Sequence, residues 1–206
     1  MLQSELIRAE RPVEPRLMIV LHGLGDSMEG YRWLPQAMQF PWLSYLLVNA
    51  PDPYYTGFAW YPMDDDPGPA LERIRKLLFD LLDQARADGF AAEKIVVFGF
   101  SQGCLMSIEV GARYPHRLAG IVGVSGYLHE PLRLVRELSP QARQQRFLIT
   151  HGTHDPLLPI DQVRPQMDLL RKAGLKIDWR EYAKTHTIDG DSELSALRGF
   201  VSDSYV

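Results

Sequence analysis

Short apolar segments recur along the chain at intervals that suit the strands of one sheet. Each is rich in Val, Ile, Leu or Phe and is separated from the next by a helical pattern or a turn-rich loop. Most lack a strict alternation of apolar and polar residues, which is typical of strands covered on both faces. The segments are Leu17–Leu21, Tyr45–Asn49, Lys94–Gly99, Gly120–Val124, Phe147–Thr150 and Lys176–Tyr182. This pattern predicts a parallel sheet.

Segments with helical spacing lie between these strands. The clearest has apolar residues at offsets of 0, 3, 7, 10, 11 and 14 from Leu71. Three further helices are predicted over residues 102–114, 163–173 and 192–201. Strands that alternate with helices imply right-handed crossovers. We therefore expect an α/β fold, with a doubly wound, mostly parallel sheet flanked by helices, and one domain over residues 1–206, because no linker divides the chain.

The composition excludes several classes of partner. The chain is 46% hydrophobic, which suffices for a core, and its 22 basic against 26 acidic residues give a net charge of −4. It therefore lacks the basic excess of a nucleic-acid-binding protein. No apolar run approaches the ~20 residues that span a bilayer. Charges interrupt the first ten residues, where a secretory signal would be apolar. We expect a cytoplasmic protein with no nucleic-acid partner and no stable membrane insertion.

Metal and redox chemistry have little support in the sequence. Cys104 is the only cysteine, which rules out an internal disulfide and a cysteine-built metal site. His151, His154 and Asp155 have offsets compatible with metal ligands, but no further ligand cluster accompanies them. We expect no metal and no cofactor, and we interpret Cys104 as a small packed residue.

A nucleophile motif stands where a predicted strand gives way to a helix. Residues 99–103 read Gly-Phe-Ser-Gln-Gly. In the G-x-S-x-G elbow, a sharp turn lifts the serine above the sheet edge, and the small flanking residues let strand and helix approach closely. The alternative is a glycine-bounded turn in which Ser101 caps the helix. We interpret Ser101 as the nucleophile.

A serine hydroxyl needs an imidazole to take its proton and a carboxylate to orient that imidazole. On this type of fold the chain order is serine, acid, histidine. Asp155 follows the predicted strand at 147–150, and His186 is the only histidine beyond it. Asp155 could instead start an Asp-Pro turn, with Asp161 as the reserve acid, and His186 could be a surface histidine. The order predicts a triad of Ser101, Asp155 and His186.

Acyl transfer also requires donors for the oxyanion. The main-chain N–H of Gln102, directly after the nucleophile, is one candidate. Residues 22–26, His-Gly-Leu-Gly-Asp, follow the first predicted strand, and their glycines permit a tight turn that points the Leu24 N–H at the site. Met28 stands where the third glycine of a dinucleotide loop would be, which argues against that alternative.

Together these segments resemble the phospholipase/carboxylesterase family of α/β-hydrolases, which includes acyl-protein thioesterases and small carboxylesterases. The resemblance rests on residues 21–26, 99–103, 151–156 and the loop with His186, so it spans most of the chain. It implies an α/β-hydrolase fold without a large lid, and activity on short-chain esters, thioesters or lysophospholipids. The sequence departs from the family pattern at Lys184-Thr-His-Thr187, where a glycine usually precedes the histidine.

An aromatic loop at residues 54–63 follows the second predicted strand, on the side of the sheet where α/β proteins bind ligands. Its apolar residues could line an acyl pocket with Leu24 and the residues after Asp155, although ordinary core packing would explain them equally well. The predicted substrate-binding residues are Phe58, Trp60, Met63, Leu157 and Leu158. The acidic run 64–66 could disfavour anionic substrates or simply be a solvated loop.

The sequence thus predicts a serine hydrolase that cleaves carboxylic esters or thioesters through an acyl-enzyme. A lysophospholipase, peptidase or acyltransferase on the same scaffold, or a non-catalytic binding module, are the alternatives, because fold alone does not decide among them. The expected partner is a small-molecule or acylated substrate, and a homodimer is possible.

Overall fold

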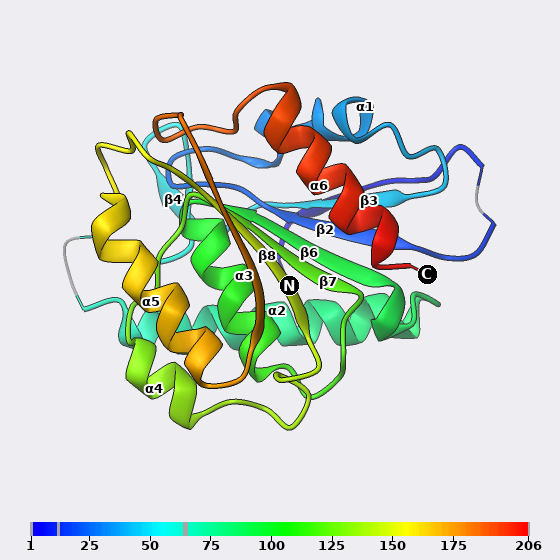
Figure 1. Cartoon of the computed structure of the whole chain (residues 1–206). Coiled ribbons are helices and arrows are strands. Elements are labelled where there is room, and N and C mark those ends of the chain that lie inside the picture. The colour runs from blue at the N-terminus through cyan, green and yellow to red at the C-terminus, as the bar shows by residue number, and fades with distance from the viewer. Residues whose placement is uncertain (1, 12, 64–65, 206) are drawn as a thin grey trace.

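The computed structural model describes residues 2–11, 13–63 and 66–205. Within them, seven strands form one sheet in the order β1-β3-β2-β6-β7-β8-β9, and β4 and β5 form a separate hairpin (Figure 1). All neighbours in the large sheet are parallel except β1, which runs antiparallel to β3. The strands are β1 (Ser4–Ile7), β2 (Leu17–Leu21), β3 (Ser44–Val48), β4 (Asp52–Tyr54), β5 (Gly57–Ala59), β6 (Ile95–Phe100), β7 (Gly120–Val124), β8 (Arg146–Gly152) and β9 (Lys176–Tyr182).

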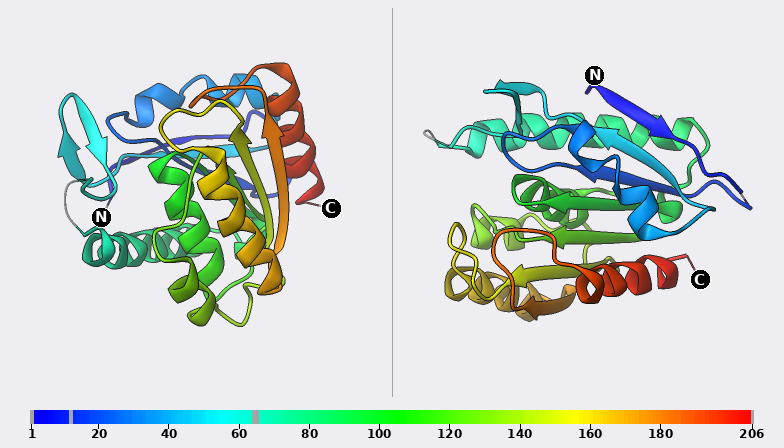
Figure 2. Two further views of the ribbon diagram at one scale, coloured as in Figure 1. Left: turned by 60° about the vertical axis from the view of Figure 1, so that its left-hand side comes forward. Right: turned by 90° about the horizontal axis from the view of Figure 1, so that it is seen from above.

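Helices cover both faces of the sheet, as Figure 2 shows. The core on one face is built with α2, α3, α4 and α5, and the core on the other with α1 and α6. The α-helices are α1 (Leu34–Met38), α2 (Gly68–Ala87), α3 (Gln102–Arg113), α4 (Pro131–Arg136), α5 (Ile160–Lys172) and α6 (Asp191–Asp203). Short 3-10 helices span Met28–Tyr31 and Ala92–Lys94. This is the predicted doubly wound α/β architecture.

Strands β2, β6 and β7 contain only apolar residues and glycine because both of their faces are covered. In β2, Leu17, Ile19 and Leu21 join the core beneath α2–α5, whereas Met18 and Val20 join the core beneath α1 and α6. All five side chains are at most 1% exposed. Successive strand residues point to opposite faces, so a strand with helices on both sides favours apolar residues at every position.

Several elements were not predicted, and each lacks a strong apolar pattern. Strand β1 is short and half-exposed, and it is held by pairing with β3 rather than by burial. The β4–β5 hairpin has three residues in each strand. Helices α1 and α4 have five and six residues, too few to show a helical period. The predicted helices and the six predicted strands are all present, with ends that differ by a few residues.

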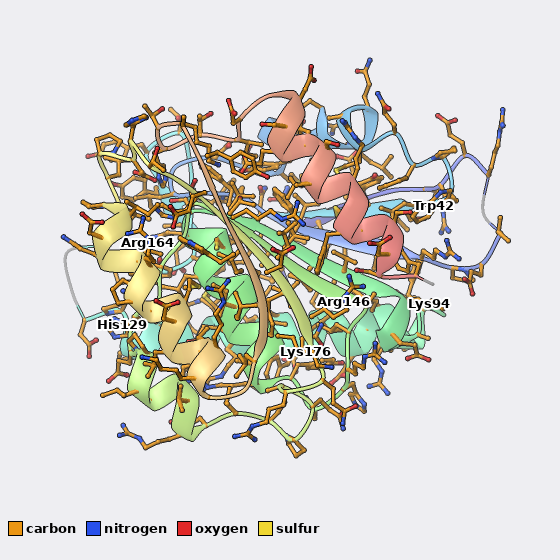
Figure 3. All side chains as sticks on the ribbon, in the orientation of Figure 1. Trp42, Lys94, His129, Arg146, Arg164 and Lys176 are labelled. Atoms are coloured by element: carbon orange, nitrogen blue, oxygen red, sulfur yellow. The ribbon has the colours of Figure 1, made fainter. Side chains whose placement is uncertain are left out.

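Charged side chains lie over the outer surface of the layers, with Arg164 on α5 and Lys176 at the start of β9 among those labelled in Figure 3. Arg164 forms an ion pair with Glu181 at 2.7 Å. Across the described ranges, no helix is both long and apolar enough to cross a membrane. The cytoplasmic location stays a prediction.

Candidate active site

Ser101 stands between β6 and α3, at the carboxyl edge of the parallel strands. Its backbone has φ +53° and ψ −115°, a conformation that is unfavourable for a residue with a side chain. The turn is held from below, since the Ser101 N–H donates to the Val124 carbonyl at 2.9 Å and the Ser101 carbonyl accepts from the first turn of α3. Surrounding structure therefore maintains the strained elbow that the motif predicts.

The structure brings Ser101, His186 and Asp155 together, although 85 residues separate the first two. The Ser101 Oγ–H donates to His186 Nε2 at 2.9 Å, and the His186 Nδ1–H donates to Asp155 Oδ2 at 2.7 Å. The His186 ring also packs on the Phe100 ring, with centroids 5.1 Å apart. This series of contacts suits transfer of a proton from a serine hydroxyl to a neutral imidazole.

The carboxylate of Asp155 is buried and fully hydrogen-bonded. While Oδ2 faces His186, Oδ1 accepts the main-chain N–H groups of Leu157 and Leu158 at 2.9 and 3.0 Å. Burial alone would raise the pKa of Asp155, but the hydrogen bonds from Leu158, His186 and Leu157 outweigh it and hold the pKa below its usual value. The group therefore stays anionic beside an imidazole that becomes positive during proton transfer.

The loop that follows β2 lies directly against the elbow. A Cβ atom built on Gly23 would lie 3.4 Å from the Ser101 Cβ, and one built on Gly103 would overlap the Leu21 carbonyl oxygen. Of the main-chain hydrogen bonds found in the described residues, none uses the Leu24 or Gln102 N–H as donor. Neither N–H group is occupied in those bonds, and unoccupied donors are what an oxyanion hole requires; its assignment to Leu24 and Gln102 stays a prediction.

His22 fixes the shape of this loop from within the core. Its Nδ1–H donates to the Gly23 carbonyl at 2.6 Å, and its Nε2 accepts the Ala50 N–H at 3.0 Å. The Trp60 indole N–H donates to the His22 carbonyl at 2.8 Å. Burial lowers the pKa of His22, so the ring is neutral and acts as a donor on one side and an acceptor on the other.

The side chain of Gln102 ties the elbow to the aromatic loop. Its Oε1 accepts the Trp60 N–H at 3.0 Å, and its Nε2–H donates to the Tyr61 carbonyl at 2.9 Å. The same Nε2 lies 3.4 Å from the Met63 sulfur. Sequence reasoning named only the main-chain N–H of Gln102, because the partners of its side chain lie about 40 positions earlier in the chain.

The predicted substrate-binding residues divide into three situations. Met63 and Leu157 are 55% and 69% exposed, so each offers apolar surface near Gln102 or Asp155. Phe58 and Leu158 are half-buried. Trp60 is 0% exposed, and both its main-chain and indole N–H groups are bonded inside the protein. Trp60 therefore belongs to the core in this structure and offers no surface to a substrate, which corrects the prediction.

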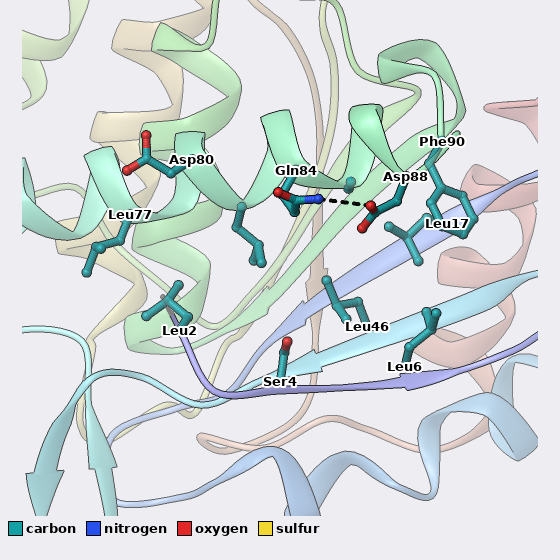
Figure 4. Close-up of a pocket in the computed structure, with 12 residues that line it drawn as sticks. Leu2, Ser4, Leu6, Leu17, Leu46, Leu77, Asp80, Gln84, Asp88 and Phe90 are labelled. Carbon is teal, nitrogen blue, oxygen red and sulfur yellow. Dashed lines mark hydrogen bonds between the residues drawn. The ribbon is translucent and has the colours of Figure 1, made fainter.

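A separate apolar cavity of about 340 Å³ lies between α2 and the edge of the sheet formed by β1, β3 and β2 (Figure 4). Leucine side chains such as Leu46 and Leu77 line it, and none of the predicted site residues does.

Two other predictions concern the acidic run 64–66 and metal binding. Asp64 and Asp65 of the acidic run lie outside the described residues. Among residues 2–11, 13–63 and 66–205, no three His, Cys, Asp or Glu side chains are grouped as metal ligands would be.

One further feature of the site, a buried ion pair, gave no clear signal in the sequence, whereas Cys104 was predicted to be a small packed residue. Lys184 and Glu193 form an ion pair beside the His186 loop although both side chains are almost completely buried. Cys104 lies behind the elbow, where its sulfur fills the space left by Gly123 and Gly126. Burial raises the pKa of the Cys104 thiol to about 12, so it is unreactive at neutral pH.

A serine, an imidazole and a carboxylate in hydrogen-bonded sequence, above the carboxyl edge of a parallel sheet, are typical of the serine hydrolases with an α/β-hydrolase fold. The phospholipase/carboxylesterase family matches residues 2–204. The chain is 35% identical over 157 residues to acyl-protein thioesterase 1 of Schizosaccharomyces pombe, covering 69% of each chain. It is 27% identical over 208 residues to acyl-protein thioesterase 1 of Yarrowia lipolytica, covering 91% of each.

Solved structures share the fold. Esterase PE8 has a TM-score of 0.88 at 24% identity, covering 98% of both chains. The Bacillus cereus carboxylesterase has a TM-score of 0.84 at 19% identity, covering 99% of this chain and 95% of its own. The chain belongs to the phospholipase/carboxylesterase family of α/β-hydrolases. It is a hydrolase of the carboxylesterase and thioesterase type.

Proposed function

We propose that the chain hydrolyses carboxylic esters or thioesters through a covalent acyl-enzyme on Ser101. The observation that carries this proposal is the pair of hydrogen bonds from Ser101 Oγ to His186 Nε2, at 2.9 Å, and from His186 Nδ1 to Asp155 Oδ2, at 2.7 Å. A neutral imidazole between a hydroxyl and a buried carboxylate is the arrangement that makes a serine nucleophilic.

In the first half-reaction, Ser101 Oγ attacks the substrate carbonyl carbon while its proton passes to His186 Nε2. Asp155 holds the ring in the Nδ1–H form and stabilises the resulting imidazolium. The Leu24 and Gln102 N–H groups donate to the oxyanion of the tetrahedral intermediate. The C–O or C–S bond then breaks, and the leaving alcohol or thiol takes the proton from His186.

In the second half-reaction, a water molecule gives a proton to His186 and attacks the acyl carbon. The second tetrahedral intermediate collapses, Ser101 recovers its proton from His186, and the carboxylic acid leaves. No external oxidant, reductant or metal takes part in either half.

The acyl group of the substrate is proposed to lie against the exposed apolar side chains of Met63 and Leu157 and against half-buried Phe58 and Leu158. Acylated small molecules and acylated proteins are both candidate substrates, and the acyl-protein thioesterases among the relatives favour a thioester. Measuring kcat/KM for p-nitrophenyl esters of increasing acyl-chain length tests the role of this apolar surface. We expect Leu157→Asp to lower kcat/KM for medium-chain esters about tenfold. The matched control is Leu132→Asp, because Leu132 on α4 is similarly exposed, and it should leave kcat/KM unchanged.

The test of the nucleophile is labelling with an active-site phosphonylating reagent, followed by intact mass and peptide mapping. We expect one adduct, on Ser101, with loss of ester hydrolysis in proportion, and a fall in kcat of about 10³-fold or more in Ser101→Ala. Full kcat in that variant would refute the proposal. Hydrolysis of amide substrates at rates comparable to esters would favour a peptidase, and transfer to added alcohols or amines an acyltransferase.

A further inference from the structure

The loop between β9 and α6 (Figure 1) contains His186, and a buried ion pair attaches this loop to the protein. Lys184 Nζ donates to Glu193 Oε1 at 2.6 Å, and the two side chains are 1% and 0% exposed. Lys184 comes two residues before His186, and Glu193 lies in the first turn of α6. The pair therefore joins the start of this loop to the helix that follows it.

Each charged group also holds a main-chain atom on the far side of His186. Lys184 Nζ donates to the Thr187 carbonyl at 2.7 Å, and the second oxygen of Glu193 accepts the Asp189 N–H at 2.6 Å. The ion pair thus fixes the loop both just before and just after the imidazole.

The main chain of Lys184 meets the acid loop as well. The Lys184 carbonyl accepts the His154 N–H at 3.1 Å, directly before Asp155. A Cβ atom on Gly152 would overlap the carbonyl oxygens of Lys184 and Thr185, so the main chain of the His186 loop packs directly against the end of β8. A shift of Lys184 would consequently move His186 relative to both Asp155 and Ser101.

Stability alone does not account for two buried charges at this place. Burial lowers the pKa of Lys184, against the attraction of Glu193, which reflects the desolvation that the pair must overcome. Apolar residues of similar volume are often as stabilising as a buried ion pair. They could fill the same space, but they could not bond the Thr187 carbonyl or the Asp189 N–H.

We propose that Lys184 and Glu193 are positioning residues that set the location of the His186 ring for the reaction. The inference rests on the proposed function, since it assigns the pair a role in the Ser101–His186 contact. The two residues contact neither substrate nor reacting atoms, and the inference depends on the three hydrogen bonds that their side chains make within a single loop.

The test is the double variant Lys184→Met/Glu193→Leu, which removes both charges and keeps most of the volume. We expect it to fold with a urea midpoint near that of the wild-type protein, because no unpaired charge is left buried. KM should stay within about twofold, while kcat and the rate of Ser101 phosphonylation fall about 10- to 100-fold, because displacement of a catalytic group by a fraction of an ångström is enough.

The control is Arg113→Met/Glu109→Leu, an ion pair on α3 whose side chains are 9% and 8% exposed and also contact Glu137 and Arg75. It should keep the wild-type kcat. Wild-type kcat in the Lys184/Glu193 double variant would overturn the inference, as would an equal loss of kcat in both double variants.

A second variant keeps the test decisive should the double variant fail to fold. Glu193→Asp keeps the negative charge that neutralises Lys184, but its side chain is one methylene shorter and cannot reach both Lys184 Nζ and the Asp189 N–H, so we expect kcat to fall several-fold with KM unchanged. An unaltered kcat would again contradict the role. Ser101→Ala separates the two proposals: if it stays active the proposed function fails, whereas an inactive Ser101→Ala beside fully active Lys184 and Glu193 variants removes only the positioning role.

Discussion

Two halves of the site are held by different kinds of interaction. The elbow around Ser101 is fixed by the main chain, with Gly99 and Gly103 letting β6, α3 and the end of β2 approach to backbone contact. The loop around His186 is fixed by side chains, chiefly the Lys184–Glu193 pair. The first half depends on glycines at points of backbone contact, and the second depends chiefly on two charged side chains that lie nine residues apart in the sequence.

This difference explains why the two halves should respond differently to substitution. A backbone contact cannot be relieved without moving a strand or a helix, so damage to the elbow should affect folding and catalysis together. Damage to the histidine side should change kcat with little change in stability. Each prediction below tests one side of this contrast.

The largest effect is expected for Gly99→Ala. The new Cβ would overlap the Gly103 carbonyl, a main-chain group that cannot rotate away. We expect the free energy of unfolding to fall by ~4 kcal/mol or more and Ser101 labelling to disappear, measured by urea unfolding and mass spectrometry. The matched control is Gly199→Ala on α6, where a Cβ meets nothing within 4 Å. It should stabilise by ~0.5–1 kcal/mol; a stable, fully labelled Gly99→Ala protein would contradict the contrast.

On the histidine side, Asp155→Asn should abolish turnover without unfolding the protein. The amide can still accept the Leu157 and Leu158 N–H groups through its oxygen, which leaves an NH₂ facing the His186 Nδ1–H. The imidazole must then carry its proton on Nε2, where it cannot accept from Ser101. We expect kcat to fall ~10³–10⁴-fold with the urea midpoint nearly unchanged. A variant that loses stability in proportion to activity would show that the carboxylate is mainly structural.

The same contrast governs what the sequence could predict. Strands buried on both faces are apolar throughout, so β2, β6 and β7 were evident, whereas β1 is recognisable only through its pairing with β3. The elbow is encoded within five consecutive residues, 99–103, because its geometry depends on glycines next to the serine.

Other parts of the site depend on contacts that no local sequence pattern indicates. The order of residues selected His186 and Asp155, but nothing in their neighbourhood reveals that Lys184 is buried against Glu193. Trp60 was predicted to contact substrate but is buried, because an aromatic residue in a loop near the site can equally well complete the core. Its two N–H groups find partners in His22 and Gln102, which no local pattern indicates.

An intermediate effect is expected for Gln102→Ala, which leaves the Gln102 main-chain N–H in place. The Trp60 N–H and the Tyr61 carbonyl would lose their partner inside the protein. We expect a loss of ~1–3 kcal/mol in stability and about a tenfold fall in kcat/KM. The matched control is Gln145→Ala, because Gln145 bridges the Leu118 N–H and carbonyl in the same way, far from the triad. It should lose similar stability and keep kcat/KM; equal losses of activity in both would make the Gln102 side chain merely structural.

The smallest effect is the expected loss of folding stability when the pH is lowered. His22 lies beneath the oxyanion loop and His151 beneath the acid loop, and burial lowers the pKa of each below its ordinary 6.5. Protonation would break the bond from the Ala50 N–H to His22 Nε2, and it would place an N–H on His151 Nδ1, for which no acceptor is found in the described residues. Below pH 6.5 the unfolded chain therefore binds more protons than the folded one, so stability falls as the pH falls, by up to ~1.4 kcal/mol per pH unit for each histidine.

Urea unfolding between pH 7.5 and 5.5 measures the slope of stability against pH. The variant His151→Gln should flatten this slope, whereas the control His116→Gln, at an exposed position, should not. An unchanged slope in His151→Gln would mean that His151 takes up its proton without loss of packing. The loop that contains Asp155 would then be less rigid than the loop above His22.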